Sequence, residues 1–291
     1  MTGKIVRAVA GFYYVHCRED GCVYQCRARG LFRKDGQKPL VGDDCEFHLT
    51  HTEDTEGSVD RILPRKNALV RPPVANVDQA AVVFALESPA PNLSLLDRFL
   101  ILMARQNIPA VIIFNKTDLG TAEDLEKAYR GAGCSFFAVS VKEGTGLPKL
   151  REAFRGKTTV LAGPSGVGKS SLTNYLCPGA GMQTGEVSRQ TQRGRQTTRH
   201  AQLFSCGEDS YLFDTPGFSS LTLEGMRPEE VKDFFPEFQK FEPRCRFQGC
   251  MHMAEPDCGV KEAVSAGQIS GYRYESYRQL VLELREGMRR R

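Results

Sequence analysis

A phosphate-binding loop constrains most strongly what this chain can fold into. Residues 163–170 read G-P-S-G-V-G-K-S, which matches the P-loop pattern G-x-x-x-x-G-K-[ST]. The apolar stretch Thr158–Ala162 precedes the loop, and the stretch Ser171–Leu176 follows it as a helix. In this context backbone N–H groups surround phosphates, Lys169 supplies positive charge and the Ser170 hydroxyl can ligate Mg²⁺. The residues expected to bind the nucleotide phosphates are Gly163, Pro164, Ser165, Gly166, Val167, Gly168, Lys169, Ser170 and Ser171.

A guanine-specificity motif comes before the phosphate loop. Residues 115–118 read N-K-T-D and follow an apolar stretch, 109–114. Asp118 can accept hydrogen bonds from the N1–H and the 2-amino group of guanine, a donor pair that adenine lacks. Asn115 can bridge the base and the phosphate loop, and the Lys116 side chain can lie along the ring. The chain is therefore expected to prefer GTP to ATP.

A further guanine contact is expected after the next strand-like stretch, 135–140. Ser140 and the backbone N–H of Val141 stand where GTPases place groups near guanine O6. A serine at a strand end is also a common turn former, so Ser140 alone is weak evidence. In an ordinary GTPase the phosphate loop comes first along the chain, so the order of the motifs is rotated here.

A third nucleotide motif concerns the γ-phosphate. Residues 214–217 read D-T-P-G at the end of the strand-like stretch 211–213. The Asp214 carboxylate can hold Mg²⁺ through water, and the Gly217 N–H can face the γ-phosphate. Phe218 stands where Ras-like enzymes carry a glutamine that orients the attacking water. Because phenylalanine cannot orient water, we expect intrinsic hydrolysis to be slow and to need help from elsewhere.

The segment Glu186–His200 has the composition of a mobile switch. Thr198 is the expected second hydroxyl ligand of Mg²⁺ beside Ser170, and Thr197 is the alternative. The arginines of the segment either bind RNA or phosphate or belong to a solvated loop, and both interpretations stay open because a switch must be mobile and recognisable by a partner. These arginines are Arg189, Arg193, Arg195 and Arg199.

Potential metal ligands are concentrated in a short C-terminal stretch. Cys245, Cys250, His252 and Cys258 follow the spacing C-x4-C-x-H-x5-C. Three thiolates and one imidazole complete a tetrahedral Zn²⁺ shell with no open position, so the predicted zinc site is structural. A small helical segment with little core gains stability from such a metal. The alternative is a group of unrelated reduced thiols.

The residue pattern changes twice along the 291 residues, which predicts a multidomain protein. Residues 1–70 alternate in short strand-like stretches between turns, as in an all-β OB-type barrel, and an RNA-binding role for them rests on analogy with OB folds. Residues 71–220 alternate strands and helices, as in an α/β domain with a mainly parallel sheet. Residues 221–291 hold short helical pieces, the zinc cluster and a last helix whose apolar stripe should pack on its own domain.

The composition is that of a soluble protein, with 41% hydrophobic and 25% charged residues. A net charge of +4 permits an RNA partner without demanding one. No apolar run approaches the roughly 20 residues of a membrane helix, and the first residues do not resemble a signal peptide, so the cytoplasm is the expected location.

In that compartment the ten cysteines predict metal ligands and thiols rather than disulfides. A second metal site that uses His16 with Cys17, Cys22 and Cys26 is a minor alternative, because the spacing C-x4-C-x3-C matches no strong pattern. The cysteines expected to be core or surface thiols are Cys17, Cys22, Cys26, Cys45, Cys134, Cys177 and Cys206.

With these motifs the chain resembles the RsgA family, also called YjeQ or YloQ, over essentially its whole length. The resemblance rests on residues 115–118, 163–170 and 214–218 and on the stretch Cys245–Cys258. It implies an OB-like N-terminus, a circularly permuted GTPase domain and a C-terminal zinc domain. It also implies a GTPase of late 30S maturation that binds 16S rRNA near the decoding region and is stimulated by the subunit. We expect a monomer.

The chain departs from the family at one switch position. The family usually reads G-R-H-T-T, with the histidine proposed to aid catalysis, whereas residues 194–198 read G-R-Q-T-T. Gln196 can orient water through its amide but cannot titrate as an imidazole does, and His200 is displaced. The water-positioning role is therefore open, with Gln196 as a candidate. The residues expected to act in hydrolysis are Lys169, Gln196, Thr198, Asp214 and Gly217.

The sequence therefore predicts an RNA-binding, ribosome-activated GTPase that hydrolyses GTP to GDP and phosphate with Mg²⁺. A P-loop kinase or ATPase is the rival interpretation among enzymes, and Asp118 argues against it. A guanine-nucleotide switch with negligible turnover is the rival among binding proteins, and Phe218 favours it.

Overall fold

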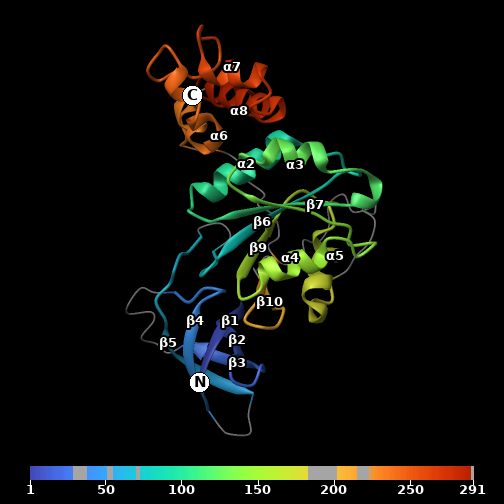
Figure 1. Ribbon diagram of the computed structural model, residues 1–291. Helices are drawn as coiled ribbons and strands as arrows, with labels where there is room; N and C mark the ends of the chain where they lie inside the picture. Colours follow the sequence, from blue (N-terminus) through green and yellow to red (C-terminus); the bar gives the residue numbers. More distant parts are fainter. Residues whose placement is uncertain are drawn as a thin grey trace. The chain divides into compact units, whose positions relative to one another are not determined.

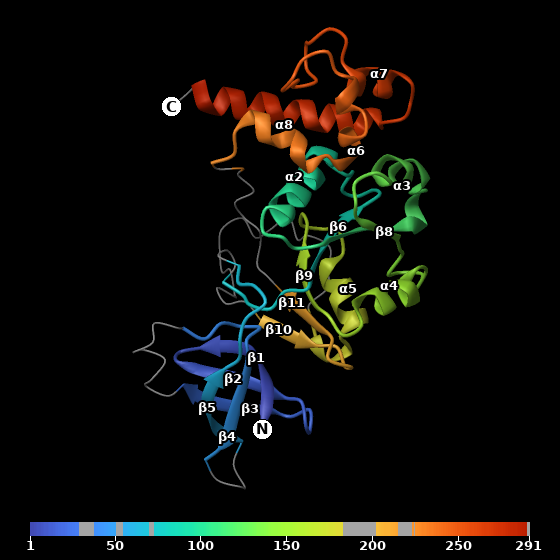
Figure 2. The same cartoon turned by 60° about the vertical axis from the view of Figure 1, so that its left-hand side comes forward.

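The computed structural model describes residues 1–28, 38–50, 55–69, 73–182, 202–214, 223 and 225–289. The chain forms two compact units and passes between them several times. The first unit comprises Met1–Ala81, Pro148–Ala162 and Gly168–Ser219, and the second comprises Val82–Leu147, Gly163–Val167 and Ser220–Arg291. Figures 1 and 2 show the elements of each unit from two sides.

The N-terminal strands of the first unit close into a barrel, drawn in blue in Figure 1. Its strands in the described residues are β1 (Thr2–Val9), β2 (Phe12–Cys17), β3 (Val23–Ala28), β4 (Asp44–Leu49) and β5 (Glu56–Ile62). Strand β1 pairs with β2 and β4, β3 pairs with β2 and β5, and β4 pairs with β5, so the ring is complete. Alternate side chains such as Ile5, Val15 and Phe47 fill the core. The predicted OB-type barrel is confirmed.

The first unit continues from the barrel into a second group of strands. These are β9 (Thr158–Ala162), β10 (Gln202–Ser205) and β11 (Tyr211–Asp214), with α4 (Leu147–Phe154), α5 (Lys169–Leu176) and η2 (Pro178–Ala180) around them in the sequence. Strand β1 pairs with β10, β10 pairs antiparallel with β11, and β11 runs parallel to β9. His16 Nδ1 lies 3.0 Å from Tyr211 Oη. The barrel is therefore joined to the strand that ends at Asp214.

The second unit contains the strand order β6-β7-β8. Strands β6 (Gln79–Ala85), which enters from the first unit, β7 (Ala110–Asn115) and β8 (Ser135–Ala138) are joined by α2 (Leu93–Ala104), η1 (Thr117–Leu119) and α3 (Glu123–Tyr129). Every residue of β6 is buried, and β7 runs parallel to β8. Such continuous burial is typical of strands covered on both faces, so the predicted α/β architecture is confirmed.

The C-terminal part of the second unit is helical. Its elements are η3 (Pro228–Phe234), α6 (Pro236–Gln239), η4 (Glu242–Arg244), α7 (Gly259–Ser265) and α8 (Gly271–Arg289). Tyr277, Leu280 and Val281 of α8 are buried with Phe235 and Phe238, so the apolar stripe packs on its own domain as predicted. Figure 2 shows α8 lying along α2 and α6. No described helix is both long enough and apolar enough to cross a membrane.

One pair of cysteines departs from the expectation that the seven cysteines outside the predicted zinc cluster are thiols. Cys177 and Cys206 form a disulfide, so the prediction of free thiols is wrong for this pair. Two chain segments far apart in the sequence bring these residues together, which no local pattern could reveal. The alternative of a second metal site is not supported either, because in the described residues His16, Cys17, Cys22 and Cys26 do not bring their donor atoms together as metal ligands would.

Candidate functional site

The side chain of Asn115 connects the guanine motif to the phosphate loop. Asn115 is the last residue of β7 and is buried. Its Nδ2 donates a hydrogen bond to the Val167 carbonyl at 2.9 Å, and its Oδ1 accepts one from the Val141 backbone N–H at 3.2 Å. The bridging role predicted for Asn115 therefore has a geometric basis, since one amide holds two loops that the sequence assigns to the nucleotide.

Asp118 lies in η1 with its carboxylate held by two neighbours. The Ser140 hydroxyl donates a hydrogen bond to Asp118 Oδ1 at 2.7 Å, and Lys142 Nζ lies 3.5 Å from Asp118 Oδ2. The Ser140 hydrogen bond holds the pKa of Asp118 below its usual value. The carboxylate is therefore ionised at neutral pH, as an acceptor for guanine donors must be. Ser140, weak evidence in the sequence, thus orients the residue predicted to select guanine.

Lys116 precedes η1 in a left-handed backbone conformation, with φ at 67°. Its Nζ donates a hydrogen bond to the Ser88 carbonyl, in the chain that follows β6. The Lys116 side chain therefore joins the segments that follow β6 and β7. This position is compatible with its predicted place along a bound base.

The first half of the phosphate loop depends on glycine. Gly163 has φ at +138°, and a Cβ atom there would lie 2.1 Å from the Val83 carbonyl oxygen. No other residue fits so close to strand β6 without moving the backbone. The loop can therefore lie against this strand only because residue 163 is glycine.

The second half of the loop becomes the N-terminus of α5. Gly168 is the N-cap in a left-handed conformation, and α5 begins at Lys169. The N-cap residue Gly168 has no side chain that could cap the first turn of α5. The N–H groups at a helix N-terminus are suited to bind an anion, which the helix dipole also favours. Ser170 and Ser171 follow in this first turn, half-buried, where the sequence places phosphate and Mg²⁺ contacts.

The remaining predicted hydrolysis residues are described only in part. Asp214 is the last residue of β11, opposite Gln202 of β10. Its position at a strand end agrees with the pattern. The switch residues Gln196, Thr197 and Thr198, together with the four arginines, His200, Gly217 and Phe218, lie outside the described residues, so their roles stay predictions.

The four predicted zinc ligands come together at one point of the second unit. Cys245, Cys250, His252 and Cys258 have donor atoms within 4.8 Å of one another, and all except Cys245 are fully buried. Cys245 Sγ lies 3.8 Å from Cys258 Sγ, and His252 Nδ1 lies 3.6 Å from Cys245 Sγ and 3.3 Å from Cys258 Sγ. A tetrahedral shell with Zn–S bonds of about 2.3 Å has edges of about 3.8 Å. The donor set and its spacing therefore fit Zn²⁺.

A carboxylate that the motif does not include orients the histidine. Glu242 Oε1 lies 3.1 Å from His252 Nε2, the ring nitrogen opposite the sulfur cluster. Burial lowers the pKa of His252, which favours the neutral ring needed for metal binding. Glu242 stands three residues before Cys245, but no spacing rule in the sequence marks it. Metal-binding histidines commonly use such a second partner to fix the ring.

Two family models match the chain. "RsgA N-terminal domain" matches residues 2–59, and "RsgA GTPase" matches residues 62–224. Together they cover the barrel and all the nucleotide motifs.

Curated relatives and solved structures extend the similarity to the full length. A protein from Agathobacter rectalis and one from Alkaliphilus metalliredigens, both named "Small ribosomal subunit biogenesis GTPase RsgA", are each 47% identical to this chain. The alignments cover 98% of both chains in the first case and 99% in the second. The crystal structure of YjeQ from Thermotoga maritima is 37% identical with a TM-score of 0.78, over 97% of this chain and 98% of that one. The structure of YloQ, "a circularly permuted GTPase", is 37% identical with a TM-score of 0.76, over 98% and 95%.

Proposed function

The chain belongs to the RsgA family of GTPases, and we propose that it hydrolyses GTP to GDP and phosphate during late maturation of the small ribosomal subunit. The observation that carries this proposal is the arrangement around Asn115 and Asp118. One amide joins the guanine motif to the phosphate loop, and a serine holds the guanine-selecting carboxylate ionised. Family membership removes the rival interpretation as a P-loop kinase.

In the proposed mechanism each chain residue has a separate task. Asp118 accepts hydrogen bonds from guanine, while the N–H groups of the phosphate loop and the Lys169 ammonium bind the phosphates. The Ser170 and Thr198 hydroxyls and the Asp214 carboxylate would hold Mg²⁺, which supplies positive charge for the developing phosphate anion. Gln196 is the candidate for orienting water. Because Phe218 cannot do so, turnover depends on a partner.

Nucleotide competition tests the guanine assignment. Fluorescent GDP bound to the protein should be displaced by GTP at concentrations at least about 1,000-fold below those needed for ATP. Asp118→Asn should lose this preference and favour xanthosine nucleotides, because the amide can donate to the 2-carbonyl of xanthine. The control is Asp124→Asn on the exposed side of α3. ATP that displaces GDP as well as GTP does would refute the assignment.

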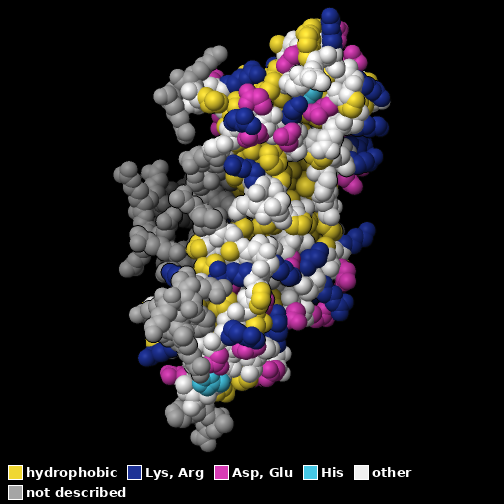
Figure 3. All heavy atoms as spheres, turned by 90° about the vertical axis from the view of Figure 1, so that its left-hand side faces the viewer, with side chains coloured by type: hydrophobic (Ala, Val, Ile, Leu, Met, Phe, Trp, Pro, Cys, Tyr) yellow, Lys and Arg dark blue, Asp and Glu magenta, His cyan; other side chains and the backbone are white. Residues whose placement is uncertain are grey.

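We propose that the barrel binds 16S rRNA through the outer face of β1, β2 and β3. The Arg7 guanidinium lies 3.8 Å from the centroid of the Tyr14 ring, and that of Arg27 lies 4.9 Å from the centroid of Phe12. In each pair the arginine and the aromatic residue lie opposite each other on neighbouring strands. Interleaved aromatic and cationic side chains suit stacked bases and phosphates. On the face drawn in Figure 3, basic side chains are interspersed with acidic ones, so charge alone marks no RNA surface there.

Matched arginine substitutions test this surface. Arg7→Ala should weaken binding to 16S rRNA and lower the slope of log affinity against log salt by about one, because one phosphate contact is lost. Arg61→Ala is the control, since Arg61 is an exposed barrel arginine paired with Glu46. Equal affinities of the two variants would argue against this face.

We also propose that the chain carries one structural Zn²⁺, acts as a monomer and works in the cytoplasm, where small subunits mature. The Cys3His geometry supports the metal. The boundaries of the barrel, the GTPase domain and the zinc domain at residues 70 and 220 stay predictions.

A further inference from the structure

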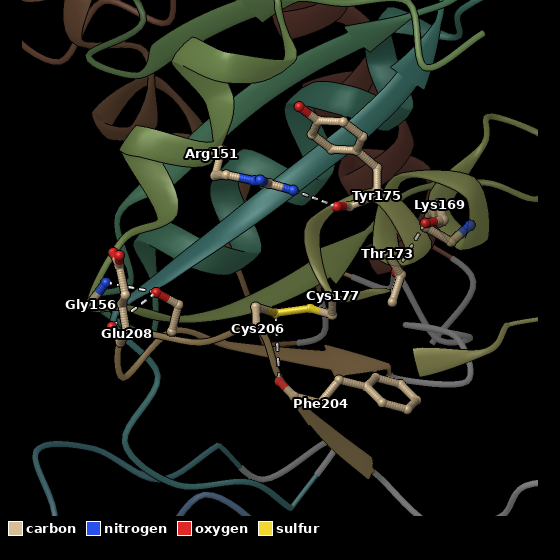
Figure 4. The surroundings of a disulfide bond; sticks show 10 residues. Arg151, Gly156, Lys169, Thr173, Tyr175, Cys177, Phe204, Cys206 and Glu208 are labelled. Carbon is tan, nitrogen blue, oxygen red and sulfur yellow. Dashed lines mark hydrogen bonds between the residues drawn. A yellow bond between two sulfur atoms is a disulfide. The ribbon is translucent and has the colours of Figure 1, made fainter. Parts of the chain in front are cut away.

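The disulfide between Cys177 and Cys206 links two segments that each lead to predicted nucleotide-binding residues. Cys177 directly follows α5, the helix that begins with the phosphate-loop lysine, Lys169. Cys206 directly follows β10. Strand β10 pairs with β11, the strand that ends at Asp214. The Cα atoms of the two cysteines are 4.2 Å apart, across 29 residues of sequence. Figure 4 shows the sulfur–sulfur bond between the end of the helix and the end of the strand.

A cavity of about 490 Å³ adjoins one of the two cysteines. Cys206 belongs to its lining, whereas Cys177 is fully buried. Arg151, Arg155 and Glu208 also line the cavity, and the Arg155 and Glu208 side chains are more than half exposed. The lining therefore reaches solvent beside Cys206, with volume enough for a small thiol.

Other cysteines of the described residues lack this combination. Burial raises the pKa of Cys26 to about 11 and of Cys45 to about 12, so both stay protonated in the barrel core. A protonated thiol is a poor nucleophile. Cys22 is exposed but is not joined to another sulfur. Thiol–disulfide exchange of the kind open to Cys206 therefore has no equivalent at Cys22, Cys26 or Cys45.

We propose that Cys177 and Cys206 form a reversible redox pair and that the state of this pair sets how fast nucleotide leaves the phosphate loop. A thiolate from a small thiol enters the cavity and attacks Cys206 Sγ, and Cys177 leaves as a thiolate that takes up a proton. A second thiol attacks the mixed disulfide and frees Cys206. Two thiols are oxidised to one disulfide, and the protein gains two electrons and two protons.

The oxidised pair changes what holds the end of α5. Noncovalently, the last turn is fixed by the Cys177 N–H, which donates to the Thr173 carbonyl at 2.8 Å, and by Arg151, whose Nη2 donates to the Tyr175 carbonyl at 2.8 Å. The disulfide adds a covalent link from this turn to β10 and restricts their separation. Because α5 begins in the phosphate loop, opening of that loop should be easier once the link is reduced. This step rests on nucleotide binding by the family's GTPase domain.

Thiol mapping and nucleotide release together test the proposal. Zinc-loaded full-length protein is equilibrated in glutathione buffers from fully reduced to fully oxidised, alkylated and mapped by peptide mass. Cys177 and Cys206 should become protected together and reversibly, with unchanged zinc content. Release of fluorescent GDP should be at least about threefold faster in the reduced state, within the range of coupled sites. For each of the single variants Cys206→Ser and Cys177→Ala, the rate of GDP release should not depend on the glutathione buffer.

Three results would overturn the proposal: both cysteines alkylated in the oxidised buffer, a disulfide that survives the reduced buffer, or release rates that do not follow the redox state. The thiol mapping needs no bound nucleotide. Protein that binds no GDP but titrates at these cysteines would therefore count against the GTPase assignment and not against the redox pair, and the wild-type measurements stand even if a variant misfolds.

Discussion

At the scale of single residues, the candidate guanine site depends on a few side chains that hydrogen-bond to one another. Asn115 and Asp118 could be predicted from the sequence because their motif is local and its chemistry is specific. The sequence predicts Ser140 near guanine O6, but it could not predict the contacts that Ser140 and Lys142 make with Asp118, because a serine and a lysine after a strand usually form only a solvated turn. The roles of Ser140 and Lys142 follow from their distances to Asp118, which depend on the register of the parallel strands β7 and β8.

The Ser140 hydrogen bond should make guanine binding resistant to acid. Because this bond lowers the pKa of Asp118, the bound carboxylate persists above its folded pKa and is lost only as pH falls through that lowered value. Ser140→Ala should weaken GDP binding by about 10- to 150-fold at pH 7, since hydrogen bonds to charged groups contribute about 1.5–3 kcal/mol. Its affinity should also decline at a higher pH than that of the wild type.

Fluorescent GDP titrations between pH 7 and pH 4 measure both effects. Ser135→Ala, on an exposed serine at the start of β8, is the control. Parallel pH profiles for Ser140→Ala and the wild type would show that Ser140 does not stabilise the carboxylate.

At the scale of elements, α8 is attached to the α/β part of the second unit by a buried ion pair. Arg273, 2% exposed, donates hydrogen bonds to Asp97 of α2 and to Glu237 of α6. The helices themselves could be predicted from their periodic apolar residues. Their attachment could not, because nothing local distinguishes Arg273 from the exposed arginines of the same helix.

Loss of Asp97 should leave the buried Arg273 paired with Glu237 alone. Asp97→Ala should destabilise the protein by about 1.5–3 kcal/mol, since it removes a buried hydrogen bond between charged groups. Glu283→Ala removes the neighbouring, exposed pair between α8 and Arg98, and should cost less than about 1 kcal/mol. Urea unfolding of both variants measures the difference, and equal midpoints would mean that the buried pair does not hold α8.

The zinc cluster is the second feature at the scale of elements. Cys250→Ala should lower the metal content from about one Zn²⁺ per chain to near zero and expose the aromatic core around Phe238 to solvent, because a structural zinc site stabilises its own fold. Cys134→Ala, which removes a free thiol of the same unit, should keep the metal. Metal analysis and near-ultraviolet circular dichroism measure both. A fully folded, metal-free wild type would contradict the assignment.

At the scale of the whole molecule, the rotated order of motifs gives the chain its organisation. The guanine motif lies early, and the strand that ends at Asp214 comes late and is followed by the C-terminal helices. The barrel and the α/β fold could be predicted because each leaves a pattern within a short stretch, and the permutation because each motif is local and the sequence gives their order. The pairing of β1 with β10 and the disulfide could not, because both join segments whose distance in sequence hides their contact.

The central claim is that a ribosomal partner activates this GTPase. Phosphate release measured at moderate salt, with and without purified 30S subunits, tests it most directly, with 50S subunits as the matched control and Lys169→Ala as the inactive variant. The account predicts slow release by the protein alone and at least about tenfold faster release with 30S but not 50S, because Phe218 cannot orient the attacking water as the glutamine of Ras-like enzymes does. The same rate with and without 30S subunits would contradict it.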